Sequence, residues 1–253
     1  MFAGALRAEW IKLTTIRSHF VLAIVAVAFS FLVVLLTANA ASDFDFATGE
    51  DLADLVVGVG LVTIMLLAVV SVLATTGEFT YNTLRPTFAA IPNRWSALAA
   101  KLVINVVTNM VLTAITVIVG WVGASAILDR STITLSDGGA RGQLMALVLL
   151  SGLLSMLGMA LAMLMRNSAA AIAILLLWPF VVESLLAGFF TVLDQEGLVK
   201  FLPYIAGFRM VNLFDEGSDT SDLLSPTVGG IYFACVVIGL WLLGALSTDR
   251  RDA

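Results

Sequence analysis

The chain has 253 residues, of which 60% are hydrophobic and only 12% are charged, and its mean hydropathy is +1.04. Soluble domains carry about 25% charged residues, so this composition excludes a soluble protein and indicates an integral membrane protein. The formal net charge of −5 points to no particular partner until it is divided between the two sides of the membrane. One cysteine, Cys235, excludes an intrachain disulfide.

The first segment, residues 1–19, predicts an amphipathic helix ahead of the first apolar run. Apolar residues recur along it at steps of three and four, with charged residues between them. These apolar residues are Phe2, Leu6, Trp10, Leu13 and Ile16. A helix of this kind lies along the membrane surface with its Trp at headgroup level, so we expect an interfacial helix here.

Six apolar segments follow, each near the roughly 20 residues that a helix needs to cross the hydrocarbon. The expected spans are 20–38, 52–75, 96–127, 144–165, 169–193 and 227–246. The first apolar run exceeds the roughly 7–15 residues of a signal peptide, so we expect it to be retained. The predicted fold class is therefore all-α, a polytopic membrane protein with six transmembrane helices in a single domain, 1–253. No internal repeat is visible, which weakens an inverted-repeat transporter.

Charge orients the spans, because six crossings place both termini on one side. Nine of the thirteen Lys and Arg residues then share that side. They are Arg7, Lys12, Arg17, Arg85, Arg94, Lys101, Arg166, Arg250 and Arg251. The positive-inside rule therefore predicts cytoplasmic termini. On the other side, residues 194–225 predict an extracellular loop with short helices in the outer leaflet, interrupted at Pro203.

A polar segment, residues 77–95, joins the second and third spans on the predicted cytoplasmic side. Gly77 is expected to end the second span, and a short helix parallel to the membrane is expected to follow and to end near Pro92. Such a coupling helix is well placed to receive a push from a soluble partner, although a plain connector is the alternative. The expected contact residues are Gly77, Glu78, Thr83, Leu84, Arg85 and Phe88.

A polar stripe runs along the third span, since Asn105, Asn109, Thr113 and Thr116 are spaced by four, four and three residues. Two interpretations weigh evenly: a translocation path at a subunit interface, and hydrogen bonding between helices inside the bundle. In the fourth span, Met156 and Met159 are flexible apolar residues that suit a promiscuous cavity, although packing in the core is favoured.

The intramembrane acid is Glu183, which follows Pro179 in the fifth span. A carboxylate at this depth costs several kcal/mol in lipid, so it must face protein or water. We favour a structural carboxylate that bonds a neighbouring helix near the outer end over a substrate contact. Pro179 is expected to kink the span.

The sequence offers no catalytic constellation. Its only histidine, His19, lies at a span boundary, and one His without a cluster of Cys or acids builds no metal site. A phosphate-binding G-x-x-x-x-G-K-[ST] loop is missing from the sequence. We therefore expect no enzyme activity, no cofactor, no metal and no nucleic-acid partner for this chain, and any ATP must be hydrolysed by another chain.

Three stretches together resemble a known family. They are the amphipathic Arg7 to Ser18; Gly77-Glu78 with Asn82-Thr83-Leu84-Arg85, Pro92 and Ala99-Ala100-Lys101; and Trp178 to Glu183 with Leu202-Pro203. They resemble the ABC-2 type permease family, the membrane subunits of bacterial ABC exporters, and most of all its actinobacterial members. Where that family often has Gly before the Thr, this chain has Asn82, which also tolerates a left-handed conformation.

The resemblance implies two six-span subunits docked on two cytoplasmic ATPase subunits that carry ATP and Mg²⁺, in a bacterial plasma membrane. The second permease would be identical or different, and the substrate an amphipathic or hydrophobic molecule moved outward. Glu78 and Arg85 are the residues we expect to face the ATPase. Three alternatives stay open: an ATP-independent carrier or channel, a membrane-embedded enzyme, and a signalling or assembly partner of an ATPase.

Overall fold

The computed structural model describes residues 2–41, 49–91, 93–127, 138–211 and 223–251, and these ranges contain helices and no strand. The helices are α1 (Phe2–Thr15), α2 (Arg17–Ala41), α3 (Gly49–Thr80), α4 (Leu84–Ala90), α5 (Arg94–Ile127), α6 (Gly138–Met165), α7 (Ser168–Leu177), the π-helix η1 (Trp178–Val182), α8 (Glu183–Val192), the 3₁₀-helix η2 (Glu196–Phe201), α9 (Pro203–Phe208), the 3₁₀-helix η3 (Arg209–Val211) and α10 (Pro226–Arg251).

Six helical segments are long and apolar enough to cross a membrane: α2, α3, α5, α6, the continuous α7–η1–α8, and α10. Each coincides with one of the six predicted spans. The predicted all-helical class is confirmed for the described residues, and six such helices are compatible with the predicted multi-pass membrane protein. Within the predicted loop 194–225, residues 196–211 form η2, α9 and η3, whereas 212–222 lie outside the described residues.

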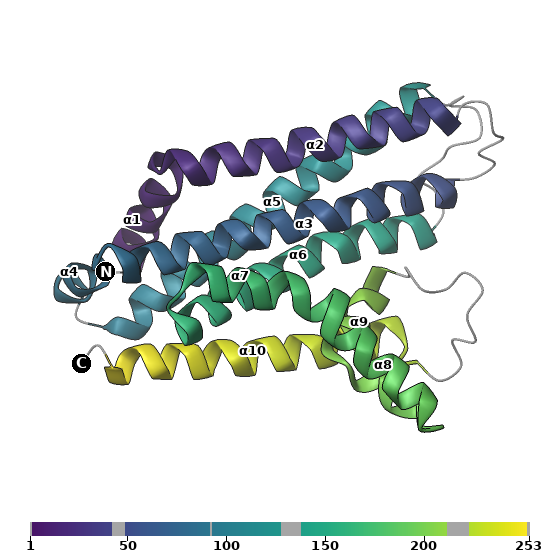
Figure 1. Ribbon diagram of the computed structural model, residues 1–253. Helices are drawn as coiled ribbons and strands as arrows, with labels where there is room; N and C mark the ends of the chain where they lie inside the picture. The colour runs from purple at the N-terminus through teal and green to yellow at the C-terminus, as the bar shows by residue number, and fades with distance from the viewer. Residues whose placement is uncertain (1, 42–48, 92, 128–137, 212–222, 252–253) are drawn as a thin grey trace.

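The long helices lie side by side, with α3 and α6 in the centre (Figure 1). Helices α2 and α5 pack on one side of this pair, and α7 and α10 on the other. Both chain ends, α1 and α4 lie at one end of the bundle, which we call the terminal end. Helices α8 and α9 lie at the opposite end.

The apolar core sits between α3 and α6. Ile64, Leu147 and Leu154 are completely buried there. Gly158 permits the close approach of these helices, because a Cβ at this position would lie 2.8 Å from the backbone oxygen of Ala68. Small residues at helix contacts are the usual means of close packing in membranes.

The end of α3 differs from the prediction. Gly77 does not end the second span, since α3 continues to Thr80. The left-handed residue that ends the helix is Asn82, with φ of 53°, and the Thr83 N–H donates to the Glu78 carbonyl at 3.0 Å. The expectation that Asn82 tolerates this conformation is confirmed. Gly77 remains helical because glycine permits a helix stop but does not impose one.

Candidate functional site

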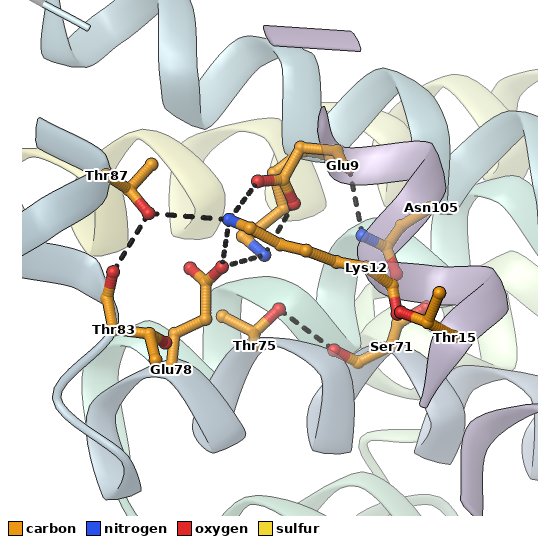
Figure 2. Close-up of polar contacts among 10 residues, drawn as sticks. Glu9, Lys12, Thr15, Ser71, Thr75, Glu78, Thr83, Thr87 and Asn105 are labelled. Carbon is orange, nitrogen blue, oxygen red and sulfur yellow. Dashed lines mark hydrogen bonds and ion pairs between the residues drawn. The ribbon is translucent and has the colours of Figure 1, made fainter. Parts of the chain in front are cut away.

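Four charged side chains from three helices meet at the terminal end. Glu9 and Lys12 are three residues apart on α1 and therefore share a face, Glu78 lies in the last turns of α3, and Lys101 lies near the start of α5. We call these four residues the ion cluster. Figure 2 shows Glu9 and Glu78 on opposite sides of the Lys12 ammonium group.

Acids and bases alternate in the ion cluster. The Lys12 Nζ lies 2.6 Å from Glu9 Oε1 and 2.7 Å from Glu78 Oε1. The Lys101 Nζ lies 2.8 Å from Glu9 Oε2 and 3.0 Å from Glu78 Oε1. Each carboxylate thus contacts both ammonium groups, and the formal charge of the cluster is zero.

Three members of the ion cluster are buried. Glu9 and Glu78 are each 6% exposed and Lys101 is 5% exposed, whereas the Lys12 side chain is 34% exposed. Burying charges costs several kcal/mol per ion unless each is paired and hydrogen-bonded. The alternation of signs meets that condition, so the cluster is held together as a unit.

The pKa values of the two α1 residues reflect this pairing. Burial alone would raise the pKa of Glu9, but Lys101 and Lys12 outweigh it and hold the pKa below the ordinary 4.5. Burial alone would lower the pKa of Lys12, but Glu78 and Glu9 outweigh it and raise the pKa above the ordinary 10.5. Both residues are therefore charged at neutral pH.

The ion cluster also reaches α4. The Lys12 Nζ donates to the Thr87 hydroxyl at 3.4 Å, and that hydroxyl donates to the Thr83 carbonyl at 2.9 Å (Figure 2). Arg94 also contacts α4, since its guanidinium lies 5.5 Å from the centre of the Phe88 ring. The cluster therefore links α1, α3, α4 and α5.

A cavity of about 520 Å³ adjoins the ion cluster. Leu13 and Ile16 of α1 line its apolar side, and Thr76, Thr80 and Ser168 line its polar side. Ser168 is the first residue of α7. The cavity therefore lies between α1 and the start of the fifth span.

The predicted polar stripe of α5 lies on one buried face. Asn105, Asn109, Thr113 and Thr116 are each at most 4% exposed. The Asn109 side chain donates to the Leu67 carbonyl at 3.1 Å and to the Ser71 hydroxyl at 3.0 Å. These bonds support the interpretation as hydrogen bonding between helices.

The rest of the stripe is held locally or left unpaired. Asn105 donates to the Lys101 carbonyl at 2.9 Å and Thr116 to the Leu112 carbonyl at 2.9 Å. The Thr113 hydroxyl has no partner among the described residues. Asn105 is the one stripe residue that lines the cavity beside the ion cluster.

The two predicted cavity methionines have different environments. Met159 is completely buried and packs with Leu98, Met163 and Trp241, as expected for the favoured packing in the core. Met156 is partly buried and lines a groove of about 740 Å³ between α5, α6 and α10. Gly142 and Gly152 also line this groove.

The predicted contact segment is only partly exposed. Glu78 does not face outward as predicted, because its carboxylate pairs with Lys12 and Lys101 inside the bundle. Leu84 is 6% exposed, and Gly77 and Phe88 are partly buried, whereas Thr83 is exposed. The Arg85 side chain lies outside the described part of the structure. Tyr81, which sequence reasoning missed, is 79% exposed at this end.

Glu183 is buried, at 1% exposed, and both of its oxygens accept backbone hydrogen bonds from α9 at 2.9 Å. The interpretation of Glu183 as a structural carboxylate that bonds a neighbouring helix agrees with this geometry.

Sequence reasoning missed the pairing inside the ion cluster. The apolar periodicity of residues 1–19 places Glu9 and Lys12 only among the charged residues of a surface helix, and Lys101 falls within the predicted span 96–127. One signal was present in the sequence: an acid and a base lie three residues apart in segment 1–19, and another acid, Glu78, lies on the same predicted side of the membrane. Among the described residues, no group of His, Cys, Asp and Glu is arranged to hold a metal ion.

Comparison with models of known protein families and with curated proteins finds no match for the chain.

Proposed function

We propose that the chain is the permease subunit of an ABC exporter and moves an amphipathic or hydrophobic substrate outward across a bacterial plasma membrane. ATP is hydrolysed on two copies of a separate cytoplasmic ATPase subunit. A second permease, identical or different, completes the membrane part. In this arrangement the terminal end faces the cytoplasm.

The observation that carries the proposal is the link from α4 through the ion cluster. Helix α4 is short and lies outside the ends of the long helices (Figure 1). Thr87 on α4 contacts Lys12, and the cluster joins α1 to α3 and α5. A force applied to α4 therefore reaches α1 and two spans at once, as a motor on a separate chain requires.

Glu78 has a different part in this proposal from the one expected of it. Its carboxylate transmits the displacement inside the permease and does not touch the ATPase. The exposed residues at the turn before α4, Tyr81 and Thr83, supply the contact. Aromatic side chains are favoured at the centres of such interfaces.

The groove between α5, α6 and α10 supports the substrate class. It is lined by apolar and small residues such as Val106, Met110, Met156 and Ala234. Flexible methionines adapt to apolar ligands of different shapes. A substrate with a long apolar part fits such walls.

The experiment compares Tyr81→Ala with Val192→Ala, two truncations of highly exposed side chains (79% and 84%) at opposite ends of the molecule. The chain is purified with the ATPase encoded beside it, and ATPase binding and ATP-driven export are measured in proteoliposomes. Tyr81→Ala is expected to weaken binding about tenfold, the size typical of an interface anchor. Val192→Ala is expected to leave binding unchanged.

Equal binding by the two variants would contradict the assigned contact surface. Transport by the purified chain alone, driven by an ion gradient, would contradict the exporter and favour the ATP-independent carrier.

A further inference from the structure

The fifth span is continuous, but at η1 it changes from α-helix to π-helix, because Pro179 interrupts the α-helical hydrogen bonding between α7 and α8. We call η1 the break. Proline has no N–H, so the Leu175 carbonyl, four residues earlier, loses its helical donor. The Tyr204 hydroxyl of α9 donates to this carbonyl at 3.1 Å. Tyr204 is 5% exposed, so the bond forms away from solvent.

The same residue also contacts the other side of the break. Tyr204 and Ile205 donate their backbone N–H groups to the two oxygens of Glu183, the first residue of α8, at 2.9 Å each. Pro203 has no N–H to satisfy, and the Ala206 N–H donates to the Leu202 carbonyl at 2.9 Å. Glu183 therefore accepts the two donors that the first turn of α9 leaves without helical partners.

Helix α9 is in turn fixed to α10. The Tyr204 ring lies 5.8 Å from the Phe233 ring, between centroids. A Cβ on Gly207 would come within 2.9 Å of Phe233, and one on Gly229 within 2.5 Å of the Ala206 carbonyl oxygen. Such contacts leave no room for α9 to slide on α10.

Helix α8, by contrast, has little packing of its own. Leu185 is 69% exposed, Phe189 57% and Val192 84%. Its direction relative to α7 is therefore set at its first residue, Glu183, and at the break.

We propose that Tyr204 holds the two sides of the break in the fifth span together. It bonds Leu175 before the break and Glu183 after it. Because α9 is fixed on α10, these two bonds set the angle between α7 and α8. Loss of either bond frees α8 to swing about η1. The expected motion of α8 does not depend on the proposed exporter function.

The first test measures the hinge directly in the full chain. Spin labels are placed at Ala173 on α7 and Val192 on α8, both exposed, in a Cys235→Ala background in lipid nanodiscs. Pulsed electron spin resonance then gives the distance distribution across η1. Tyr204→Phe and Glu183→Gln are expected to broaden it.

Tyr232→Phe is the matched control. The Tyr232 hydroxyl donates to the Phe201 carbonyl at 2.9 Å, so this variant also loses one hydroxyl bond, but one that does not span the break. It is expected to leave the distribution unchanged. If Tyr204→Phe gives the same distribution as Tyr232→Phe, the proposal is wrong.

A second test uses the origin of the unpaired carbonyl. In Pro179→Ala, the new N–H at residue 179 is available to Leu175, so the Tyr204 hydroxyl becomes redundant. Tyr204→Phe is expected to raise the unfolding equilibrium constant about three- to tenfold in the natural background, the range for hydrogen bonds between membrane helices. In the Pro179→Ala background, we expect Tyr204→Phe to raise the unfolding equilibrium constant by less than about twofold. Equal effects in both backgrounds would overturn the assignment of the bond to the break.

Discussion

The two ends of the molecule bury carboxylates in different ways. At the terminal end, Glu9 and Glu78 are neutralised by the ammonium groups of Lys12 and Lys101. At the opposite end, Glu183 is held by backbone N–H groups of α9. The first arrangement depends on the identity of side chains, and the second on the position of a helix.

This difference predicts how each region fails. Loss of one lysine leaves a buried charge with too few partners at the terminal end. At the opposite end, only substitution to proline would remove an N–H donor, so the junction between Glu183 and α9 weakens mainly when Glu183 changes or α9 moves. The following variants test this contrast, from the largest expected effect to the smallest.

Lys101→Met is expected to have the largest effect. Lys101 is 5% exposed, and its loss leaves Glu9 Oε2 and Glu78 without their buried cation. Breaking a buried ion pair from one side costs about 3–5 kcal/mol of unfolding free energy. Thermal and denaturant unfolding in detergent measure the loss.

Two further variants accompany it. Lys200→Met is the control, because within the described ranges the charge interaction of Lys200 is with an exposed ring, that of Phe201. The double variant with Glu9→Gln and Lys101→Met removes one charge of each sign, and it is expected to be more stable than Lys101→Met alone. A double variant less stable than the single one would show that the ion cluster does not act as a charge-balanced unit.

Glu183→Gln is expected to cost less, about 1–3 kcal/mol, because the amide keeps one oxygen for an α9 N–H and leaves the other N–H buried without an acceptor. The same unfolding measurements apply. A cost as large as that of Lys101→Met would mean that the carboxylate charge itself, and not its acceptor count, holds the junction.

Lys12→Met is expected to cost only about 1 kcal/mol, since the Lys12 side chain is one-third exposed and solvent screens its charge. Lys101 remains in place to balance part of the negative charge. We expect a larger effect on coupling than on stability, seen as a clear loss of ATP-driven export with only a small fall in melting temperature. Equal losses of stability in Lys12→Met and Lys101→Met would contradict the role assigned to burial.

The smallest effect is expected in the pH dependence of stability. The folded pKa of Glu9 lies below 4.5, so its contribution is complete above about pH 4.5 and is lost as the pH falls through the lowered pKa. The pKa of Lys12 lies above 10.5, so its contribution is complete below that pH and is lost as the pH rises through the raised pKa. Glu9→Gln should flatten the acid limb of the melting-temperature profile and Lys12→Met the alkaline limb. Unchanged limbs would mean that other groups control them.

Features that depend on local composition or on the surrounding lipid could be predicted from the sequence. Six spans follow from apolar runs because the hydrocarbon fixes the length of a crossing helix. The inward direction of Glu183 follows from the cost of a carboxylate in lipid. The turn at Asn82 follows from its tolerance of positive φ.

Features that depend on helix packing could not be predicted. Met156 and Met159 are three residues apart, yet one lines a groove and the other is core, and only the rotation of α6 decides between them. Lys12 and Glu78 are 66 residues apart in the chain, so their pairing depends on how α1 docks against α3. The prediction that Gly77 ends the second span was wrong, because glycine permits a helix to stop but the residues that follow it here continue the helix.

Helix α10 and helix α4 are both contacted by Arg94 at the terminal end. The Arg94 guanidinium, which packs on Phe88, also donates to the backbone carbonyl of Asp249 at 3.0 Å and contacts its carboxylate at 3.5 Å. A fluorescent dye at the exposed neighbouring position, Arg250, would therefore stand next to α4 without altering it. Energy transfer from that dye to an acceptor on a candidate ATPase would report docking near α4 in real time.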